Sequence, residues 1–211
     1  MAAKKVNSAT VGIQRIDVTL RNKPGALLVV HQFAEKAKKE IRDKQAKKEK
    51  KAKEQRQPME EAEGAKYFDD AGRECVPVTA IKKALISAAT AFDDLTKVAL
   101  RQAIFVAPAH DHGSMLVPIE KHDGGPAVGT MREDAVTIGI ATRGLADRPQ
   151  YTEWQLRVSV EFNPRLVSEE QLIALIDQAG WGVGICEGRP ERSSALGWGR
   201  FERAEVAQAA E

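Results

Sequence analysis

Alternating apolar and polar residues predict the strands of this chain. Between residues 154 and 162 every second residue is apolar, which is typical of a strand with one buried face. The same alternation predicts a strand over residues 11–20, with Ile16, Val18 and Leu20 on its apolar face. Further strands are expected at residues 100–106 and 115–119, as the two arms of a hairpin, at 135–142, and near 198–202.

Apolar residues at helical spacing predict a first core helix. It begins after the extended segment Val76-Pro77-Val78, with Thr79 as its N-cap. Phe92 and Leu95 are expected to continue it. Its buried face is formed by the apolar residues that lie one turn apart, namely Ile81, Ala84, Leu85, Ala88 and Ala89.

A second core helix is predicted after residue 168. Ser168 is its N-cap and Gln171 lies at the third helical position, so the two are expected to form a capping box. Gly180 is expected to end the helix. The inward face consists of Leu172, Ile173, Leu175 and Ile176.

The order of these elements predicts an α+β fold. A strand, a helix, several strands, a helix and a strand follow one another, as in the ferredoxin-like or RRM-like arrangement. Its antiparallel sheet carries helices on one face, and we expect the other face to be free to bind a ligand. The first strand region then covers residues 1–32, a helical insertion 33–66, the remainder of the core 67–203, and a flexible tail 204–211.

The insertion is rich in lysine. Residues 33–57 contain no Gly or Pro and are dominated by residues that favour helix. Residues 35–56 hold eleven Lys or Arg against five Asp or Glu, a net charge of +6, and the other 21 basic and 25 acidic residues give −4. Because no apolar stripe follows Ile41, this helix is expected to project into solvent or onto a partner. Pro58 is expected to end it, and residues 59–66 to form a polar linker.

Composition limits the class of protein. Hydrophobic residues make up 43% of the 211 residues, which is enough for a folded core. The first residues lack the apolar stretch of a signal peptide, and no apolar run approaches the roughly 20 residues of a membrane helix. We therefore expect a cytoplasmic protein with no membrane partner. Cys75 and Cys186 lack metal-ligand spacing, so two reduced thiols and neither a metal nor a cofactor are expected.

A stretch rich in glycine and arginine near the C-terminus is the strongest chemical signal. Glycines permit positive φ and the close approach of another backbone, and exposed amides beside arginines suit phosphate groups. The alternative is an ordinary turn between the last helix and the last strand. The stretch lacks the ending of a Walker loop and does not open a helix as a Rossmann turn does. Its candidate residues are Gly182, Gly184, Arg189, Arg192, Gly197, Trp198, Gly199 and Arg200.

The Lys-rich insertion has three interpretations. It is a solvated charged helix, a helix that contacts the backbone of nucleic acid, or a helix that docks on an acidic protein. If it contacts phosphates, affinity should fall steeply with salt. It has no aromatic residue after Phe33, so base stacking must come from Tyr67, Phe68, Trp154 or Trp198. Its central candidates for nucleic-acid contact are Lys47, Lys48, Lys50 and Lys51.

Histidine chemistry has little support in the sequence. His110-Asp111-His112 and the distant His122 match no strong metal or general-base spacing, so an exposed loop without chemistry is expected. Trp154 and Trp181 are expected to pack in the core or at its edge. No nucleophile–base–acid triad is recognisable, and we therefore expect no enzyme activity.

Two segments resemble the RAMP superfamily, the repeat-associated RNA-binding subunits of CRISPR complexes. Residues 70–85 are similar to the turn and helix start of that family, and the resemblance there extends over residues 67–89. Gly197-Trp198-Gly199-Arg200 is similar to the family's glycine-rich loop, and the resemblance there extends over residues 180–202. Val78 and Lys83 stand where the family has glycines, and Ile86 where it has an arginine. There is also a likeness to uncharacterised phage and prophage proteins, which would place the chain in the host cytoplasm. The resemblance implies RNA binding along a row of identical subunits, with Lys82, Lys83 and the arginines of the loop as the matching positions.

Three functions follow from these patterns. The first is a non-catalytic subunit that binds single-stranded nucleic acid, with RNA favoured, in an oligomer. For this function we expect the helix start at Pro77 and the glycine-rich loop to lie together beside one sheet and to form a cradle for a polyanion. The second is a phage-type structural or interaction protein that assembles with itself or mimics a subunit of a host complex. The third is an endoribonuclease that uses His110, His112 or Lys82.

Overall fold

A four-stranded antiparallel sheet forms the centre of the molecule. The computed structural model describes residues 12–32, 38, 41–43, 45–46, 56–138, 142–192 and 196–204. The strands lie in the order β10-β1-β9-β5, so the first strand is central and pairs with the last. Their bounds are β1 (Gln14–Asn22), β5 (Ile104–Pro108), β9 (Gln155–Phe162) and β10 (Phe201–Arg203).

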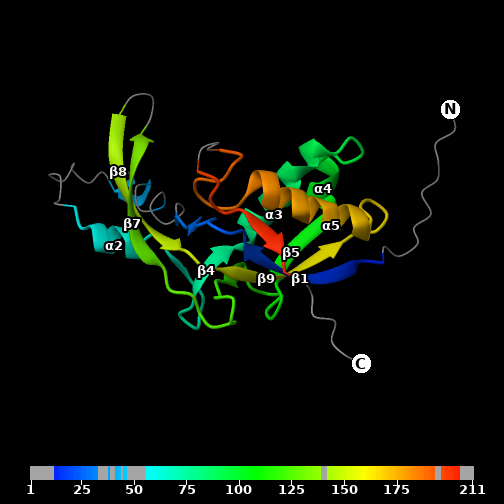
Figure 1. Cartoon of the computed structure of the whole chain (residues 1–211), viewed down its shortest axis with the longest axis horizontal. Coiled ribbons are helices and arrows are strands. Elements are labelled where there is room, and N and C mark those ends of the chain that lie inside the picture. The colour runs from blue at the N-terminus through cyan, green and yellow to red at the C-terminus, as the bar shows by residue number, and fades with distance from the viewer. Residues whose placement is uncertain are drawn as a thin grey trace.

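Two helices cover one face of this sheet. Helix α3 (Val78–Ala88) connects β1 to β5 through an insertion, and helix α5 (Glu169–Gln178) connects β9 to β10. They pack against each other on the same side of the sheet (Figure 1). This order of elements and strands confirms the predicted α+β fold with a ferredoxin-like arrangement.

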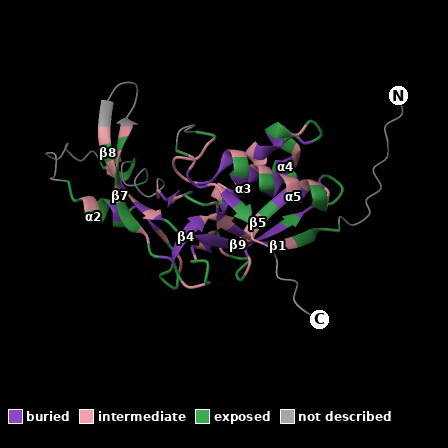
Figure 2. Ribbon diagram, in the orientation of Figure 1, coloured by how far each residue is buried: buried purple, intermediate pink, exposed green. Residues whose placement is uncertain are grey.

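The core lies between this sheet and the helices. Leu156, Val158 and Phe162 alternate along β9, and Leu85 and Leu172 meet them from the helices, all with 1% exposure or less. Figure 2 shows buried residues concentrated in the sheet and on the inner faces of α3 and α5. The predicted alternation and helical faces are those of the observed core except for Ile173, which is only half-buried, so the hydrophobic pattern located most of the core.

Two smaller sheets are built from the segments inserted between the core elements. One has the order β2-β8-β7, and its long β7–β8 hairpin stands away from the core (Figure 1). The other has the order β3-β4-β6. Short helices α2 and α4 and the turns η1 and η2 complete the described chain. The bounds of these elements are β2 (Leu28–Val29), α2 (Pro58–Glu63), β3 (Tyr67–Phe68), β4 (Glu74–Pro77), η1 (Ala89–Ala91), α4 (Lys97–Ala103), β6 (Leu116–Pro118), β7 (Thr130–Ile138), β8 (Thr142–Tyr151) and η2 (Ala179–Val183).

A buried polar network joins α2, β4 and β8. The Glu74 carboxylate accepts hydrogen bonds from Lys66 Nζ at 2.9 Å, from the Tyr151 hydroxyl at 2.7 Å and from the Gly129 amide at 2.8 Å. Burial by itself would raise the pKa of Glu74, but these three bonds hold that pKa below its ordinary value. Burial and the bond to Glu74 raise the pKa of Tyr151 far above its ordinary value. The network therefore fastens the inserted sheets to each other with satisfied buried charges.

Two strand predictions are only partly right. In the strand predicted at 100–106, residues 104–106 lie in β5, but residues 97–103 form helix α4, with Leu100 and Ala103 buried one turn apart and Thr96 accepting a hydrogen bond from the Ala99 amide. The predicted hairpin is wrong, because β5 pairs with β9 and β6 with β4. In the single strand predicted at 135–142, residues 135–138 belong to β7 and residue 142 begins β8, so two arms of a hairpin meet there.

Several expected helix boundaries differ from the structure. Helix α3 starts at Val78, with Pro77 in the N-cap position, so Thr79 lies inside the helix and does not cap it. The helix ends at Ala88, and Phe92 lies in extended backbone beyond η1. The capping box of Ser168 and Gln171 is confirmed.

Gly180 and Pro58, each predicted to end a helix, have other roles in the structure. Gly180 does not end α5; a Cβ there would lie 2.1 Å from the Phe201 carbonyl oxygen, so glycine permits β10 to approach. Pro58 begins a helix, and residues 59–63 belong to α2, which packs on the β7–β8 hairpin and is no linker. Most of the predicted Lys-rich helix, residues 33–37, 39–40, 44 and 47–55, lies outside the described residues, and residues 38, 41–43 and 45 are helical.

No helix in the part of the chain that the structure describes has the length and apolarity needed to span a membrane.

Candidate nucleic-acid interface

The glycine-rich loop between η2 and β10 is folded tightly onto itself. Gly184, Gly188, Gly197 and Gly199 all have positive φ, as the sequence predicted. The amide of Trp198 donates to the Gly188 carbonyl at 3.1 Å. The Ile185 amide donates across the loop to the Gly199 carbonyl at 3.0 Å. The Gly199 amide donates to the carbonyl of Leu27, the residue before β2, at 2.6 Å and so fixes the loop there.

These bonds change the role expected of the glycines. The expectation of exposed amides that hold phosphates fails for Gly184 and Gly199, because both amides donate to carbonyls of the protein. A Cβ at Gly199 would lie 1.9 Å from the Ile185 carbonyl oxygen, and one at Gly188 would lie 2.2 Å from the Trp198 ring. The glycines therefore make a rigid support, and any contact with a ligand falls to the side chains that the loop presents.

The three tryptophans are distributed differently from the prediction. Trp154 is fully buried, and its indole donates to the Ala26 carbonyl at 3.0 Å. Trp198, predicted to contact nucleic acid, is 9% exposed, with Gly188 on one side and the Arg132 guanidinium 4.6 Å from its ring. Trp181, predicted to pack at the core, is instead 62% exposed. Of the three, only Trp181 offers a ring face to a ligand.

The exposure of Trp181 could not be read from helical periodicity. Trp181 lies in the π-turn η2, beyond the end of α5 at Gln178, so the 100° spacing per residue of an α-helix does not extend to it. The π-turn η2 ends this helix and carries the ring outward. The sequence interpretation placed this ring in the core or at its edge.

The glycine-rich loop carries three arginines, and one of them contacts the backbone of this tryptophan. Arg200 Nε donates to the Trp181 carbonyl oxygen at 3.1 Å. Arg189 donates to the Cys186 carbonyl at 2.8 Å and forms an ion pair with Glu191 at 3.3 Å. Arg192 is exposed, and among the described residues its side chain has no ion-pair partner. Two of the three guanidinium groups therefore lie outside internal ion pairs.

Helix α3 meets this loop through its C-terminal half. Ser87 hydrogen bonds to Glu191 of the loop, and this bond helps to lower the pKa of Glu191. Lys82 lies 140° around the helix from Ser87 and places its ammonium 4.3 Å from the Phe105 ring on β5. Lys83 is exposed. The start of α3 is joined instead to the segment before β6, where Val78 N donates to Met115 O. The structure thus brings the loop residues together but keeps Lys82 and the Pro77 start apart from them.

The face of the central sheet opposite the helices is partly covered, contrary to expectation. His112 Nε2 lies 3.1 Å from an Arg15 guanidinium nitrogen, and Glu120 forms an ion pair with Arg157 at 2.9 Å. Ser159, in the middle of β9 on this face, is completely buried. The sheet therefore does not offer the open platform of an RRM-like protein.

A cleft of about 320 Å³ opens beside this covered face. Four carboxylates and two arginines line it, and both arginines form ion pairs, Arg73 with Asp69 and Arg157 with Glu120. His110 and Asp111 also line the cleft from an exposed loop. Because its fixed charge is negative, the cleft is unsuited to a polyanion.

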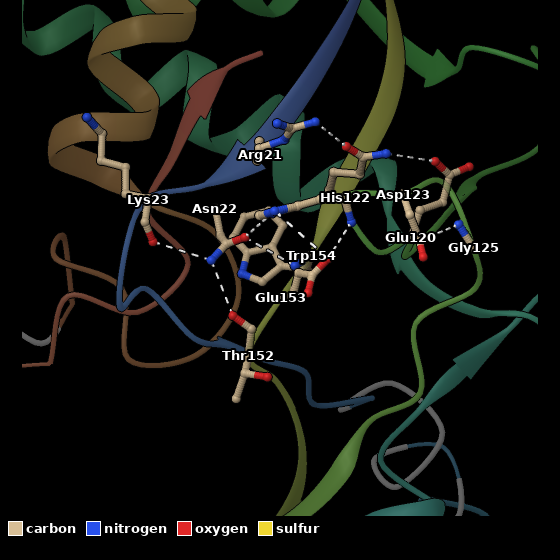
Figure 3. A network of polar contacts seen from close by, with 11 residues as sticks. Arg21, Asn22, Lys23, Glu120, His122, Asp123, Gly125, Thr152, Glu153 and Trp154 are labelled. Carbon is tan, nitrogen blue, oxygen red and sulfur yellow. Dashed lines mark hydrogen bonds and ion pairs between the residues drawn. The ribbon is translucent and has the colours of Figure 1, made fainter.

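A polar network near the end of β1 fastens the surrounding loops (Figure 3). Asn22 Oδ1 accepts from His122 Nε2 at 2.7 Å and from the Trp154 amide at 3.2 Å. Glu153 accepts from the His122 amide at 2.8 Å. These contacts join the end of β1 to the loop after β6 and to the segment before β9, which indicates a structural brace.

Lys47, Lys48, Lys50 and Lys51, the remaining predicted contacts, lie outside the described residues. Within the described part of the chain, no group of three His, Cys, Asp or Glu side chains could hold a metal ion.

Comparison with known proteins gives a distant likeness to solved structures. No protein-family model matches the chain, and no curated protein matches it. Among solved structures, the crystal structure of Cmr6 from Pyrococcus furiosus superposes with a TM-score of 0.37 at 11% sequence identity. The match covers 92% of this chain and all of that one. At this identity and TM-score the likeness assigns the chain to no family.

Proposed function

We propose that this protein binds single-stranded nucleic acid as a non-catalytic subunit of an oligomeric assembly. The observation that carries the proposal is the exposed ring of Trp181 beside Arg200, on a loop too tightly packed to collapse over it. An aromatic face next to guanidinium groups provides both stacking for bases and charge for phosphates. RNA is favoured over DNA because of the resemblance of residues 67–89 and 180–202 to the RAMP proteins.

The neighbouring side chains support this surface. Glu191 N donates to the Val183 carbonyl at 3.3 Å, which holds Arg192 next to the turn that carries Trp181. The exposed Arg192 can meet phosphate oxygens without first breaking an internal ion pair. The lysines of the insertion would add sequence-independent attraction to the backbone, as their net charge of +6 predicts.

A protein partner is the rival occupant of the same surface. Trp181 and Leu196 are 62% and 48% exposed, and exposed apolar side chains of this size also suit a protein interface. In that case the chain is a structural or interaction protein, and light scattering would show assembly with no bound nucleic acid.

Fluorescence anisotropy with a labelled single-stranded RNA at two salt concentrations tests the proposal. Trp181→Ala should weaken binding about tenfold, since a stacked base contributes about 1–3 kcal/mol. Leu166→Ala is the matched control, because Leu166 is 47% exposed at the opposite end of α5. Arg192→Glu should weaken binding and reduce the salt dependence, and Arg165→Glu, in the turn beside Leu166, should change neither.

Two results would reject the proposal. One is the absence of RNA or DNA binding by the wild-type protein at low salt. The other is equal affinity of the Trp181→Ala and Leu166→Ala variants, which would show that any binding occurs elsewhere.

A further inference from the structure

The Glu187 carboxylate is held among basic groups from three separate segments. Arg148 on β8 donates to its Oε2 atom at 3.1 Å, and His31 Nδ1 lies 3.6 Å from Oε1. Arg189, two residues further along the loop, adds a third basic group near the same carboxylate. Its interactions with His31 and the two arginines hold the pKa of Glu187 below its ordinary value. The Glu187 carboxylate thus faces three basic side chains, of which Arg189 also forms an ion pair with Glu191 at 3.3 Å.

The backbone of the loop directs Glu187 into this position. Cys186 has φ of 60° and Gly188 has φ of 61°, so left-handed residues flank Glu187 on both sides. The Glu187 amide donates to the Val29 carbonyl at 3.1 Å, which fixes this segment along the edge of β2. A left-handed conformation is unfavourable for a residue with a side chain, as at Cys186, so the surrounding fold must enforce it.

The hairpin places two arginines directly opposite each other beside this carboxylate. Arg132 on β7 and Arg148 on β8 are register partners, and partners in an antiparallel pair project from the same face. Like charges in that position destabilise the pair unless an anion lies close. Asp134 of the same strand neutralises Arg132 at 2.8 Å, whereas Arg148 depends on Glu187 from the glycine-rich loop.

Arg148 has the capacity to bind a larger anion. A guanidinium carries five N–H donors in a planar fork that matches phosphate oxygens. Among the described residues, Glu187 is the one recorded hydrogen-bond partner of this side chain. Glu187 is 40% exposed and can turn to solvent, while Arg148, at 16%, remains in the wall of the site.

We propose that Arg148, His31 and Arg189 form a binding site for a nucleic-acid phosphate, in which Glu187 occupies the phosphate position until the strand displaces it. This inference rests on the proposed function and extends the interface from Trp181 to the base of the β7–β8 hairpin. A strand bound here lies between the loop and the hairpin, and Glu187 lowers the affinity for any ligand that cannot displace it.

The test compares Glu187→Gln with Glu202→Gln by anisotropy of a labelled single-stranded RNA over a salt series. Both variants lose one negative charge, and Glu202 lies on β10 with Lys23 at 3.7 Å as its partner. Glu187→Gln should raise the affinity about fivefold, and the slope of log K against log salt should steepen by about 0.7, the value for one added phosphate contact on a single strand. Glu202→Gln should change the affinity less than twofold.

A second variant is needed because Glu187→Gln also removes the contact with Arg148 that anchors the loop. Arg148→Gln in the otherwise unchanged protein tests the phosphate-binding side chain itself. It should weaken RNA binding about fivefold, whereas Arg165→Gln should leave binding unchanged. Equal affinities of Glu187→Gln and Glu202→Gln overturn the inference, as does an Arg148→Gln variant that binds as well as Arg165→Gln. If the wild-type protein binds no nucleic acid at low salt, the proposed function itself fails, which is a different outcome.

Discussion

Replacing Tyr151 with Phe tests the buried network that joins the β7–β8 hairpin to β4. The Tyr151 hydroxyl donates to Glu74 Oε2 at 2.7 Å, and the two residues are 3% and 9% exposed. Phe fills nearly the same volume, so the change removes one hydrogen bond to a charged acceptor and leaves no large cavity. Hydrogen bonds to charged groups contribute about 1.5–3 kcal/mol, and we expect the free energy of unfolding to fall by that amount.

Urea denaturation followed by circular dichroism measures this loss. The midpoint should move to lower urea with an unchanged slope, because the surface exposed on unfolding stays the same. The melting temperature should fall by about 3–12 °C for a domain of this size. Glu74 keeps its bonds from Lys66 and Gly129, so the variant should still fold.

Tyr67→Phe is the matched control. Tyr67 is partly buried on β3 in the same inserted region, and in the described part of the chain its hydroxyl has no recorded hydrogen bond. Its loss should change the free energy of unfolding by less than about 0.5 kcal/mol. The reasoning is refuted if Tyr151→Phe is equally neutral, because Glu74 would then not depend on the tyrosine for its hydrogen bonding.

Two further predictions concern stability. Gly199→Ala should destabilise the protein by more than about 2 kcal/mol, because its Cβ would lie 1.9 Å from the Ile185 carbonyl oxygen at a φ of 65°. Gly12→Ala, which meets nothing within 4 Å, should be nearly neutral in the same urea assay, and equal effects would contradict the packing role of the loop. The folded protein holds the pKa of Glu74 below its unfolded value of about 4.3, so the stability from this group is complete above that pH and is lost as the pH falls through the folded pKa. Urea midpoints between pH 3 and 6 should show this loss, and in a Tyr151→Phe variant the total loss should be smaller and should be complete at a higher pH than in the wild type.

The core was predictable from the sequence because its signals are local and strong. Strand β9 is central and packs its apolar face against the helices, and this burial imposes the alternation seen over residues 154–162. The capping box of Ser168 and Gln171 depends on residues three positions apart, and the apolar face of α3 on residues one turn apart. These features need no knowledge of distant contacts.

The inserted sheets were not predictable in the same way. Strands β2 and β3 are two residues long, and Leu28 of β2 pairs with Tyr151, more than a hundred residues away, which leaves no periodic signal. The run that begins at Leu100 changes from helix to strand at Ile104 with no glycine or proline between the two elements. Short apolar runs of this kind are compatible with either structure.

The candidate interface was only partly visible in the sequence. The glycines and arginines of the loop were identified, but the exposure of Trp181 and the burial of Trp198 depend on how the loop folds back. Arg148 and His31 lie beside Glu187 because β2 pairs with β8. This pairing joins distant segments, so the position of the two residues could not be predicted from the sequence.

The central position of β1 has a consequence for the synthesis of the protein. Both neighbours of β1 in the sheet, β9 and β10, are translated last, so the strand stays unpaired while some 130 residues emerge, on the order of ten seconds at usual ribosome rates. Arg15, Asp17 and Arg21 place charge on alternate positions of this waiting strand. Charged residues on an unpaired strand oppose pairing with other chains. The side chains that face the covered side of the finished sheet therefore also protect β1 of the nascent chain from aggregation.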